Sequence, residues 1–312
     1  MSPEYHFNNQ TGFYRGKVRD VYSIGDHFLV MKASNRLSAF DHILPKEIPG
    51  KGQVLNQTAW FFLEATRHIV PNWAMACPFG NITFGLRCEP IPIEMVVRGY
   101  LDGHASRLYN DGIREVCGVQ MPEGLKKYEA FHQPILTPTT KAKEGHDEDI
   151  SAHDIVGKGI VQAALYEEMQ HTALALFAHG SAHAKSMGLI LADTKYEFGL
   201  YQGKLCLMDE IHTPDSSRYY LLDGYEKSLQ NGETPPQLSK EFIRQWLISK
   251  GFMGKEGQSI PDMPDEQIEK VRNQYIRLFE QVTGSAFNAL PDAPANLVEN
   301  EINALVKKQS RP

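Results

Sequence analysis

The stretch LADTKYEFGLYQGKLCLMDE, residues 191–210, constrains the fold of this chain more than any other. Its apolar residues flank Gly203 in the pattern of two strands joined by a tight turn. Side chains alternate between the two faces of a strand, so Asp193, Lys195 and Glu197 share one face of the first strand. An apolar strand pair that carries so many charges needs an explanation.

A salt-bridged hairpin on the protein surface would explain these charges, and so would a ligand site. The apolar neighbours imply substantial burial, and buried charges need partners. Glu197 and Asp209 can face each other on adjacent antiparallel strands, and proteins bind Mg²⁺ through one or two carboxylates plus substrate phosphates. Lys195, between two acids, can stay charged and reach a phosphoryl group. The pattern therefore favours a metal and phosphate site over a surface hairpin.

The composition is that of a globular protein, with 312 residues of which 42% are hydrophobic and 22% are charged. A formal net charge of -6 gives no global positive field, so we expect no nucleic-acid partner and no membrane partner. The cysteines form no CxxC pair, which argues against structural zinc. We expect a cytoplasmic protein, because the N-terminal residues lack a signal pattern and no apolar run reaches the ~18 residues of a membrane span. The oligomeric state stays open.

The order of periodic segments predicts an α+β protein. Alternating residues dominate the N-terminal part, including a hairpin that turns at Gly25-Asp26. A long helix is predicted over 155–187, with Ser151 and Asp154 as a capping box at its start. Further helices are predicted over 53–69, 240–250, 265–283 and 295–308.

Three other segments carry candidate binding residues. In RGKVRDVY, Gly16 lets a backbone approach a ligand, and Lys17 and Arg19 would share one strand face, where they suit phosphate oxygens or stay solvated. In HTPDSSRYY, small hydroxyls beside Arg218 suit a phosphate or carboxylate, although an Asp-Ser turn explains them equally well. Arg98 ends an apolar strand, where binding residues often project, although an ordinary surface arginine would explain it too.

The histidines give weaker signals. His179 and His183 are four apart on the long predicted helix, but the motif lacks the Glu of HExxH, so a polar helix face explains them better than a zinc site. His146, beside Asp147 in a polar loop, is a further candidate.

Taken together and in this order, six segments resemble the phosphoribosylaminoimidazole-succinocarboxamide synthase (SAICAR synthetase) family. They are GKVRDVY, SNRLSAFD, PIEMVVRGY, TKAKEGHDEDIS, LILADTKYEFG and MDEIHTPDSSRY, which lie between residues 16 and 220. The resemblance implies a two-lobed, ATP-grasp-like α+β fold with ATP between the lobes. It implies a strand-rich ATP-binding lobe over 1–95 and a larger α/β lobe over 96–312, which holds the ribotide and Mg²⁺ sites and ends in a helical extension.

The resemblance also implies a reaction. ATP, carboxyaminoimidazole ribotide (CAIR) and L-aspartate would give SAICAR, ADP and phosphate, with Mg²⁺ and cations to neutralise charge on the transferring phosphoryl group. Two other classes of protein share part of the pattern. A small-molecule kinase would need the same cations and acids, and a nucleotide-sensing module without catalysis would tolerate the loss of Lys195 or Asp209.

Matched by position, the resemblance implies three sets of site residues. The catalytic set is Lys195, Glu197 and Asp209, of which Glu197 and Asp209 would also ligate Mg²⁺. The ATP-binding set is Gly16, Lys17, Arg19, Glu94 and Lys141, with the adenine edge held by backbone groups of residues 94–97. The substrate-binding set is Asp41, Arg98, His104, Ser106, Asp147, Asp215, Ser217 and Arg218.

The sequence departs from the family pattern after VVRG. The family usually has a small residue, then Gly-Ser, where the Ser binds the ribotide phosphate, whereas this chain has Asp102, Gly103 and His104. Our hypothesis is that His104 takes over the phosphate contact, because a protonated His donates from both ring nitrogens and adds a positive charge. The alternative is that Ser106 or a backbone NH near Gly103 makes the contact.

Overall fold

The structure is a computed structural model that describes residues 4–141, 147–238 and 240–310. Packing divides the chain into two compact units. Unit 1 comprises Met1–Phe61, Trp73–Cys88 and Lys240–Pro312, and unit 2 comprises Phe62–Asn72 and Glu89–Ser239. This division differs from the expected boundary at residue 95, because the C-terminal segment groups with the N-terminal strands rather than with the larger lobe.

The N-terminal strands form an antiparallel sheet in unit 1. Its order is β1-β2-β3-β7-β6, with the strands β1 (Gln10–Arg15), β2 (Arg19–Ile24), β3 (Phe28–Ala33), β6 (Ala74–Phe79) and β7 (Ile82–Leu86). The predicted hairpin at Gly25 is confirmed, since β2 pairs with β3 and Gly25 has a φ of 55°. Two short strands, β4 (Ser38–Ala39) and β5 (His42–Ile43), form a separate hairpin.

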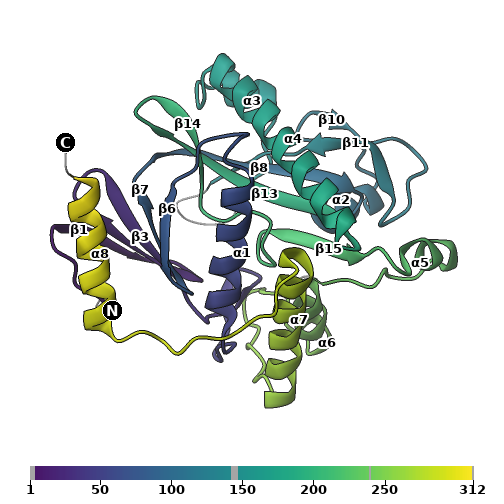
Figure 1. The fold of residues 1–312 in the computed structure, drawn as a ribbon. Coiled ribbons are helices and arrows are strands. Elements are labelled where there is room, and N and C mark those ends of the chain that lie inside the picture. Colours follow the sequence, from purple (N-terminus) through teal and green to yellow (C-terminus); the bar gives the residue numbers. More distant parts are fainter. Residues whose placement is uncertain (1–3, 142–146, 239, 311–312) are drawn as a thin grey trace. The chain divides into compact units, whose positions relative to one another are not determined.

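The three predicted C-terminal helices are confirmed (Figure 1). They are α6 (Glu241–Ser249), α7 (Asp265–Thr283) and α8 (Ala295–Gln309). Val298 and Ile302 of α8 are fully buried in the same apolar cluster as Tyr22 and Val30 of the sheet. Apolar residues of α6 and α7 join a second cluster, which includes Leu55 of α1 (Lys51–Ala65). Burial of these apolar faces explains why the C-terminal segment belongs to unit 1.

Unit 2 is built on a six-stranded antiparallel sheet. Its main path runs β11-β8-β13-β14, while β12 pairs with β8 and β15 pairs with β13. The strands are β8 (Glu89–Tyr100), β11 (Ala130–Leu136), β12 (Thr139–Thr140), β13 (Leu189–Tyr201), β14 (Lys204–Met208) and β15 (Ser217–Leu221). The predicted alternation on β8 is confirmed, because Ile93, Met95 and Val97 are all fully buried. A small hairpin, β9 (Glu115–Val116) and β10 (Val119–Gln120), completes the strands of this unit among the described residues.

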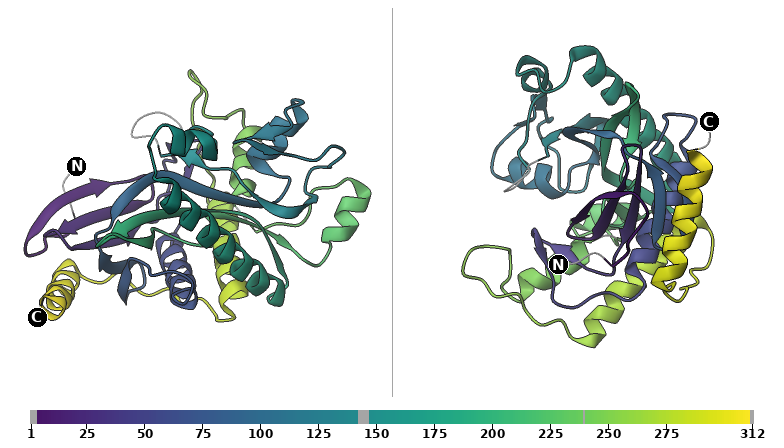
Figure 2. Two further views of the ribbon diagram at one scale, coloured as in Figure 1. Left: turned by 90° about the horizontal axis from the view of Figure 1, so that it is seen from above. Right: turned by 90° about the vertical axis from the view of Figure 1, so that its left-hand side faces the viewer.

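The long helix predicted over 155–187 is two helices, α3 (Ala152–Gly157) and α4 (Ala163–Ser186). The break falls at Gly159, whose φ of 68° lies outside the helical region. The predicted cap is confirmed, because Ser151 Oγ accepts a 3.0 Å hydrogen bond from the Asp154 amide. Helix α4 lies along one face of the unit 2 sheet and contacts β13 and β8 (Figure 2).

Two further helices of unit 2, α2 (Gly103–Asn110) and α5 (Tyr225–Asn231), were not predicted. The mixture of antiparallel sheets and helices confirms the α+β class. Among the residues that the structure describes, none of the helices has the length and apolar character needed to cross a bilayer.

Candidate active site

The charged residues of the β13–β14 hairpin pair with residues of β8 and of the segment after β12. Lys195 on β13 donates from Nζ to Glu94 Oε1 on β8 and to Glu197 Oε1, both at 2.6 Å. The other carboxylate oxygen of Glu197 forms an ion pair with Lys141. Glu94 and Glu197 are directly opposite each other in the β8–β13 ladder. We call Glu94, Lys141, Lys195, Glu197 and Asp209 the lysine–carboxylate cluster.

Electrostatic interactions within this cluster favour the charged forms of Lys195 and Glu197. Burial by itself lowers the pKa of Lys195, but the carboxylates of Glu197, Glu94 and Asp209 outweigh burial and raise that pKa above its ordinary value. Burial also raises the pKa of Glu197, yet Lys195 and Lys141 overcome this and lower it to about 2. Burial raises the pKa of Glu94, with Lys195 opposing. The buried charges are therefore partnered, as a site requires and a solvated hairpin does not.

The predicted geometry of Asp209 needs a correction. Glu197 lies opposite Met208 in the β13–β14 ladder, so Asp209 does not face Glu197 across the sheet. Asp209 instead follows the end of β14 with a φ of 54°, in the left-handed region. Its charge still acts on Lys195. Asp209 thus joins the cluster through the turn of the backbone after β14 rather than through strand pairing.

A second cluster lies further along the same face of β13. Arg98, buried on β8, donates from Nε to Thr137 Oγ1 at 2.8 Å and from Nη1 to Asp193 Oδ2 at 3.1 Å. Arg218 on β15 donates to the same oxygen of Asp193. Asp193 is four residues before Glu197, which corresponds to about 13 Å along a strand. Arg218 Nε also lies 3.9 Å from Asp102 Oδ2, so the two arginines are paired with two carboxylates.

Helix α2 begins beside these arginines. Its N-cap, Asp102, accepts from the Gly103 amide at 2.6 Å and from the Tyr220 hydroxyl at 2.7 Å. Gly103 has a φ of 56°, and a Cβ added there would lie 2.4 Å from Arg218 Nη2. The Arg218 guanidinium therefore lies directly against the Gly103 backbone, which explains why a glycine is needed at this position.

His104 and Ser106, the alternatives for the phosphate contact, lie in different surroundings. His104 Nε2 is 2.6 Å from Asp149 Oδ2, and both side chains are partly exposed. The hydrogen bond from His104 lowers the pKa of Asp149 below its ordinary value. The Ser106 side chain is buried within α2. Of these two side chains, only that of His104 is accessible to a ligand from solvent.

The remaining candidates of unit 2 lie at the start of β15 or on loops. Ser217 is buried, and its Oγ is 2.7 Å from Thr194 Oγ1. The Asp215 amide donates to Thr213 Oγ1 at 3.3 Å, so Asp215 takes part in a compact turn. Asp147 is exposed, and its charge acts on Glu94. His146 lies outside the described residues.

Gly16, Lys17 and Asp41 of unit 1 lie on turns, whereas Arg19 begins β2. Lys17 belongs to the turn between β1 and β2 and not to a strand, so the expectation that Lys17 and Arg19 share a strand face is corrected. The reason is the 2.7 Å hydrogen bond from the Gly16 amide to the Arg19 carbonyl, which closes the turn. Arg36, which was not predicted, donates to the Gly16 and Lys17 carbonyls at 3.1 and 3.2 Å. Lys17 pairs with Asp41, whose φ is 63°.

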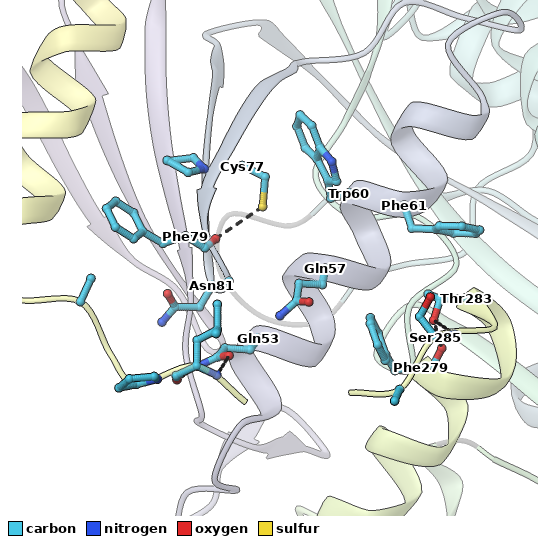
Figure 3. A pocket seen from close by; sticks show the side chains of 16 residues that line it. Gln53, Gln57, Trp60, Phe61, Cys77, Phe79, Asn81, Phe279, Thr283 and Ser285 are labelled. Carbon is cyan, nitrogen blue, oxygen red and sulfur yellow. Dashed lines mark hydrogen bonds between the residues drawn. The ribbon is translucent and has the colours of Figure 1, made fainter. Parts of the chain in front are cut away.

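Unit 1 also contains a cavity of about 550 Å³ (Figure 3). Gln53, Gln57 and Trp60 of α1 line it, together with Cys77 and Phe79 of β6 and residues from the end of α7 onward. None of the predicted site residues lines this cavity, and none of its lining residues carries a charge. It therefore differs in chemical character from both charged clusters of unit 2.

The structure thus brings together most of the unit 2 candidates in two clusters, and it adds residues that were not predicted. Asp193, Asp102 and Asp149 each pair with a predicted cation, although none was a predicted site residue. The alternation of β13 pointed to Asp193, because it shares a face with Lys195. No local pattern pointed to Asp102 or Asp149.

Comparison with known proteins shows which family shares this arrangement. The family model described as SAICAR synthetase matches residues 12–260. The chain is 54% identical over 278 residues to the phosphoribosylaminoimidazole-succinocarboxamide synthase of Cytophaga hutchinsonii, covering 89% of each protein. It is 50% identical over 309 residues to that of Bacteroides thetaiotaomicron, covering 97% of this chain and 98% of the relative.

A solved structure agrees with these relatives. The SAICAR synthase of Saccharomyces cerevisiae, solved as a complex with SAICAR, superposes with a TM-score of 0.78 at 29% identity. The match covers 92% of this chain and 99% of the yeast chain. The helices α7 and α8 lie beyond the residues that the family model matches, but the relative from Bacteroides thetaiotaomicron is covered almost completely. The chain therefore belongs to the SAICAR synthetase family.

Proposed function

We propose that this chain is an ATP-dependent ligase that joins L-aspartate to the carboxylate of CAIR and releases SAICAR, ADP and phosphate. Membership of the SAICAR synthetase family and the match to relatives named for this activity support the proposal. The observation that carries it is the pair of charged clusters on one face of β13, since the reaction needs one site for a phosphoryl group and another for a ribotide phosphate.

The chemistry requires activation of a poor electrophile. A carboxylate oxygen of CAIR attacks the γ-phosphorus of ATP, the bond to ADP breaks, and an acyl phosphate forms. The amine of L-aspartate then attacks the acyl carbon, loses a proton, and phosphate leaves. Lys195 is held as a cation by Glu94 and Glu197, so it can stabilise negative charge on the phosphoryl group without itself giving up a proton.

The residues of the lysine–carboxylate cluster fit a magnesium ion. Glu197 and Asp209 would hold it, because carboxylate oxygens are the donors that Mg²⁺ prefers and substrate phosphates complete its coordination. When bound, Mg²⁺ neutralises charge on the nucleotide phosphates. Within residues 4–141, 147–238 and 240–310, no group of three His, Cys, Asp or Glu side chains is arranged as a metal site made of protein alone. Lys141 is free to exchange its pairing with Glu197 for a nucleotide phosphate.

On the nucleotide side, Lys17 and Arg19 would bind the phosphates of ATP. Hydrogen bonds from Arg36 to the Gly16 and Lys17 carbonyls hold the turn that carries Lys17 and leads into Arg19. Because both carbonyls accept hydrogen bonds from the Arg36 guanidinium, the orientation of the turn backbone is fixed. Backbone groups of residues 94–97 would hold the adenine edge.

On the ribotide side, Arg98 and Arg218 would bind the phosphate of CAIR, assisted by the N-terminus of α2. His104 would contribute a further donor, and its contact with Asp149 would orient the ring. Asp215, Ser217 and the loop acids would line the rest of the site. The separation of about 13 Å between Asp193 and Glu197 along β13 suits a ligand whose phosphate and carboxylate lie at opposite ends.

Release of ADP tests this function. The purified chain is given ATP, Mg²⁺ and CAIR, with and without L-aspartate. The ligase releases ADP in stoichiometric amounts with SAICAR only when L-aspartate is present. A kinase that phosphorylates the ribotide would release ADP to the same extent without L-aspartate, and this result would exclude the ligase.

A further inference from the structure

The loop after β14, residues 209–216, has an unusual backbone. Asp209 has a φ of 54° and His212 a φ of 57°, so two residues that are not glycine adopt the left-handed conformation within four positions. Residues keep such a conformation only where the surrounding structure enforces it, and they gather at functional sites. The contacts around His212 show what enforces it here.

His212 is fully buried against helix α4 and the end of α1. A Cβ added to Gly180 of α4 would lie 2.2 Å from His212 Cε1, so the imidazole fills the space that a side chain at 180 would need. The Phe62 ring meets the imidazole edge-on, with centroids 4.8 Å apart. Burial, together with His179 and His183, lowers the pKa of His212 to about 3, so the ring is neutral.

The polar contacts of His212 join it to two strands of the unit 2 sheet, β13 and β15. Its Nε2 is 2.7 Å from the hydroxyl of Tyr196, and its carbonyl accepts a 2.9 Å hydrogen bond from the Tyr219 hydroxyl. Tyr196 is itself fully buried and lies between Lys195 and Glu197 on β13. Because side chains alternate, Tyr196 points to the face opposite those two residues.

A neutral buried histidine is costly where an apolar side chain would fill the same space. Among the residues that the structure describes, His212 Nδ1 has no hydrogen-bond partner, which adds to that cost. An apolar residue would keep the contact with Phe62, but it would lose the bond to Tyr196. The directional contact between Tyr196 and His212 is therefore the property that distinguishes histidine at this position.

We propose that the Tyr196–His212 hydrogen bond is a positioning contact that fixes Asp209 relative to Lys195 and Glu197. The inference rests on the proposed function, in which these three residues act on the nucleotide phosphates. The bond ties the loop that carries Asp209 to the reverse face of the strand that carries the other two. Tyr196 and His212 do not touch substrate; they hold the backbone from which Asp209 extends.

Tyr196→Phe tests the proposal, because it removes the hydroxyl and keeps the buried ring. Without ligands, we expect backbone amides of residues 210–217 to exchange hydrogen about tenfold faster, as expected for the loss of one buried hydrogen bond. In the ligase assay, we expect kcat to fall about tenfold and the Mg²⁺ concentration for half-maximal activity to rise by a similar factor. The KM values for CAIR and L-aspartate should change less than twofold.

Tyr225→Phe is the matched control, because the Tyr225 hydroxyl also makes a 2.7 Å hydrogen bond, which is partly buried, to the Tyr128 carbonyl and away from this loop. It should lose similar stability in urea unfolding but keep the wild-type Mg²⁺ dependence and loop exchange. Wild-type exchange and wild-type Mg²⁺ dependence in Tyr196→Phe would overturn the proposal. Faster loop exchange in a chain whose wild type shows no ligase activity would instead preserve the structural link and refute the proposed function.

Discussion

Replacing Gly103 by alanine adds one methyl group and tests the proposed ribotide site. The added Cβ would lie 2.4 Å from Arg218 Nη2 and 2.5 Å from Nη1, so the guanidinium must move away from the start of α2. Because this guanidinium is the end of a flexible side chain, the fold can accommodate the move. The phosphate of CAIR would lose a charge-assisted contact that is typically worth about 1.5–3 kcal/mol.

This loss corresponds to a rise of about 10- to 100-fold in the KM for CAIR, since each 1.4 kcal/mol is about a factor of ten. The left-handed backbone at 103, with a φ of 56°, adds a stability cost of about 1–2 kcal/mol for alanine. The KM for ATP should stay within about twofold of wild type, because the lysine–carboxylate cluster is untouched. Steady-state kinetics of ADP release, with each substrate varied in turn, measure both constants.

Gly112→Ala is the control that separates the clash of the new methyl group with Arg218 from the loss of stability caused by alanine at a positive φ. Gly112 also has a positive φ, of 84°, but a Cβ added there meets nothing within 4 Å. Urea unfolding should show similar losses of stability in the two variants, whereas only Gly103→Ala should weaken CAIR binding. Equal KM values for CAIR in the two variants would refute the assignment of Arg218 to the ribotide phosphate.

Three further predictions concern single charges. Asp209→Asn should keep the fold and lower aspartate-dependent ADP release by about 10²–10³-fold, as is typical when a group that stabilises transition-state charge is lost; near-normal turnover at saturating Mg²⁺ would contradict the metal assignment. Lys17→Ala should raise the KM for ATP more than that for L-aspartate, and equal changes in the two KM values would contradict a role of the Lys17 turn in ATP binding. The pKa of Glu197 is lowered from 4.5 to about 2, so its ionised form stabilises the fold above about pH 4.5, and this contribution is lost as the pH falls through the folded value near 2. Urea unfolding between pH 5 and 2.5 should therefore show a shallower pH dependence for Glu197→Gln than for wild type, and parallel curves would argue against the ion pairs.

The strands were predictable because their pattern is local. Ile93, Met95 and Val97 alternate in the sequence and are all fully buried in the structure. Helix α2 was missed because it has only eight residues and begins with Gly103, a residue that ordinarily weakens a helix. The long helix was expected to continue across Gly159, although the glycine takes a positive φ and ends it.

The candidate site could be predicted only in part, for a physical reason. Lys195 and Glu197 are two residues apart, so alternation along a strand reveals their shared face. The hydrogen bonds that Asp193 accepts from Arg98 and Arg218 join residues separated by 95 and 25 positions. Such pairs depend on which strands are neighbours in the sheet, and a single sequence contains no local signal for that choice.

The two faces of β13 explain how one strand can serve both clusters. One face carries Asp193, Lys195 and Glu197, while Thr194 and Tyr196 on the other face are buried and hydrogen-bonded to the loop and strand that follow β14. A shift of the strand by one residue would exchange the faces and place the charges in the apolar interior, at a cost of several kcal/mol for each unpaired ion. The buried face therefore fixes the register of β13, and the register fixes the spacing of about 13 Å between the proposed phosphate-binding and phosphoryl-binding ends.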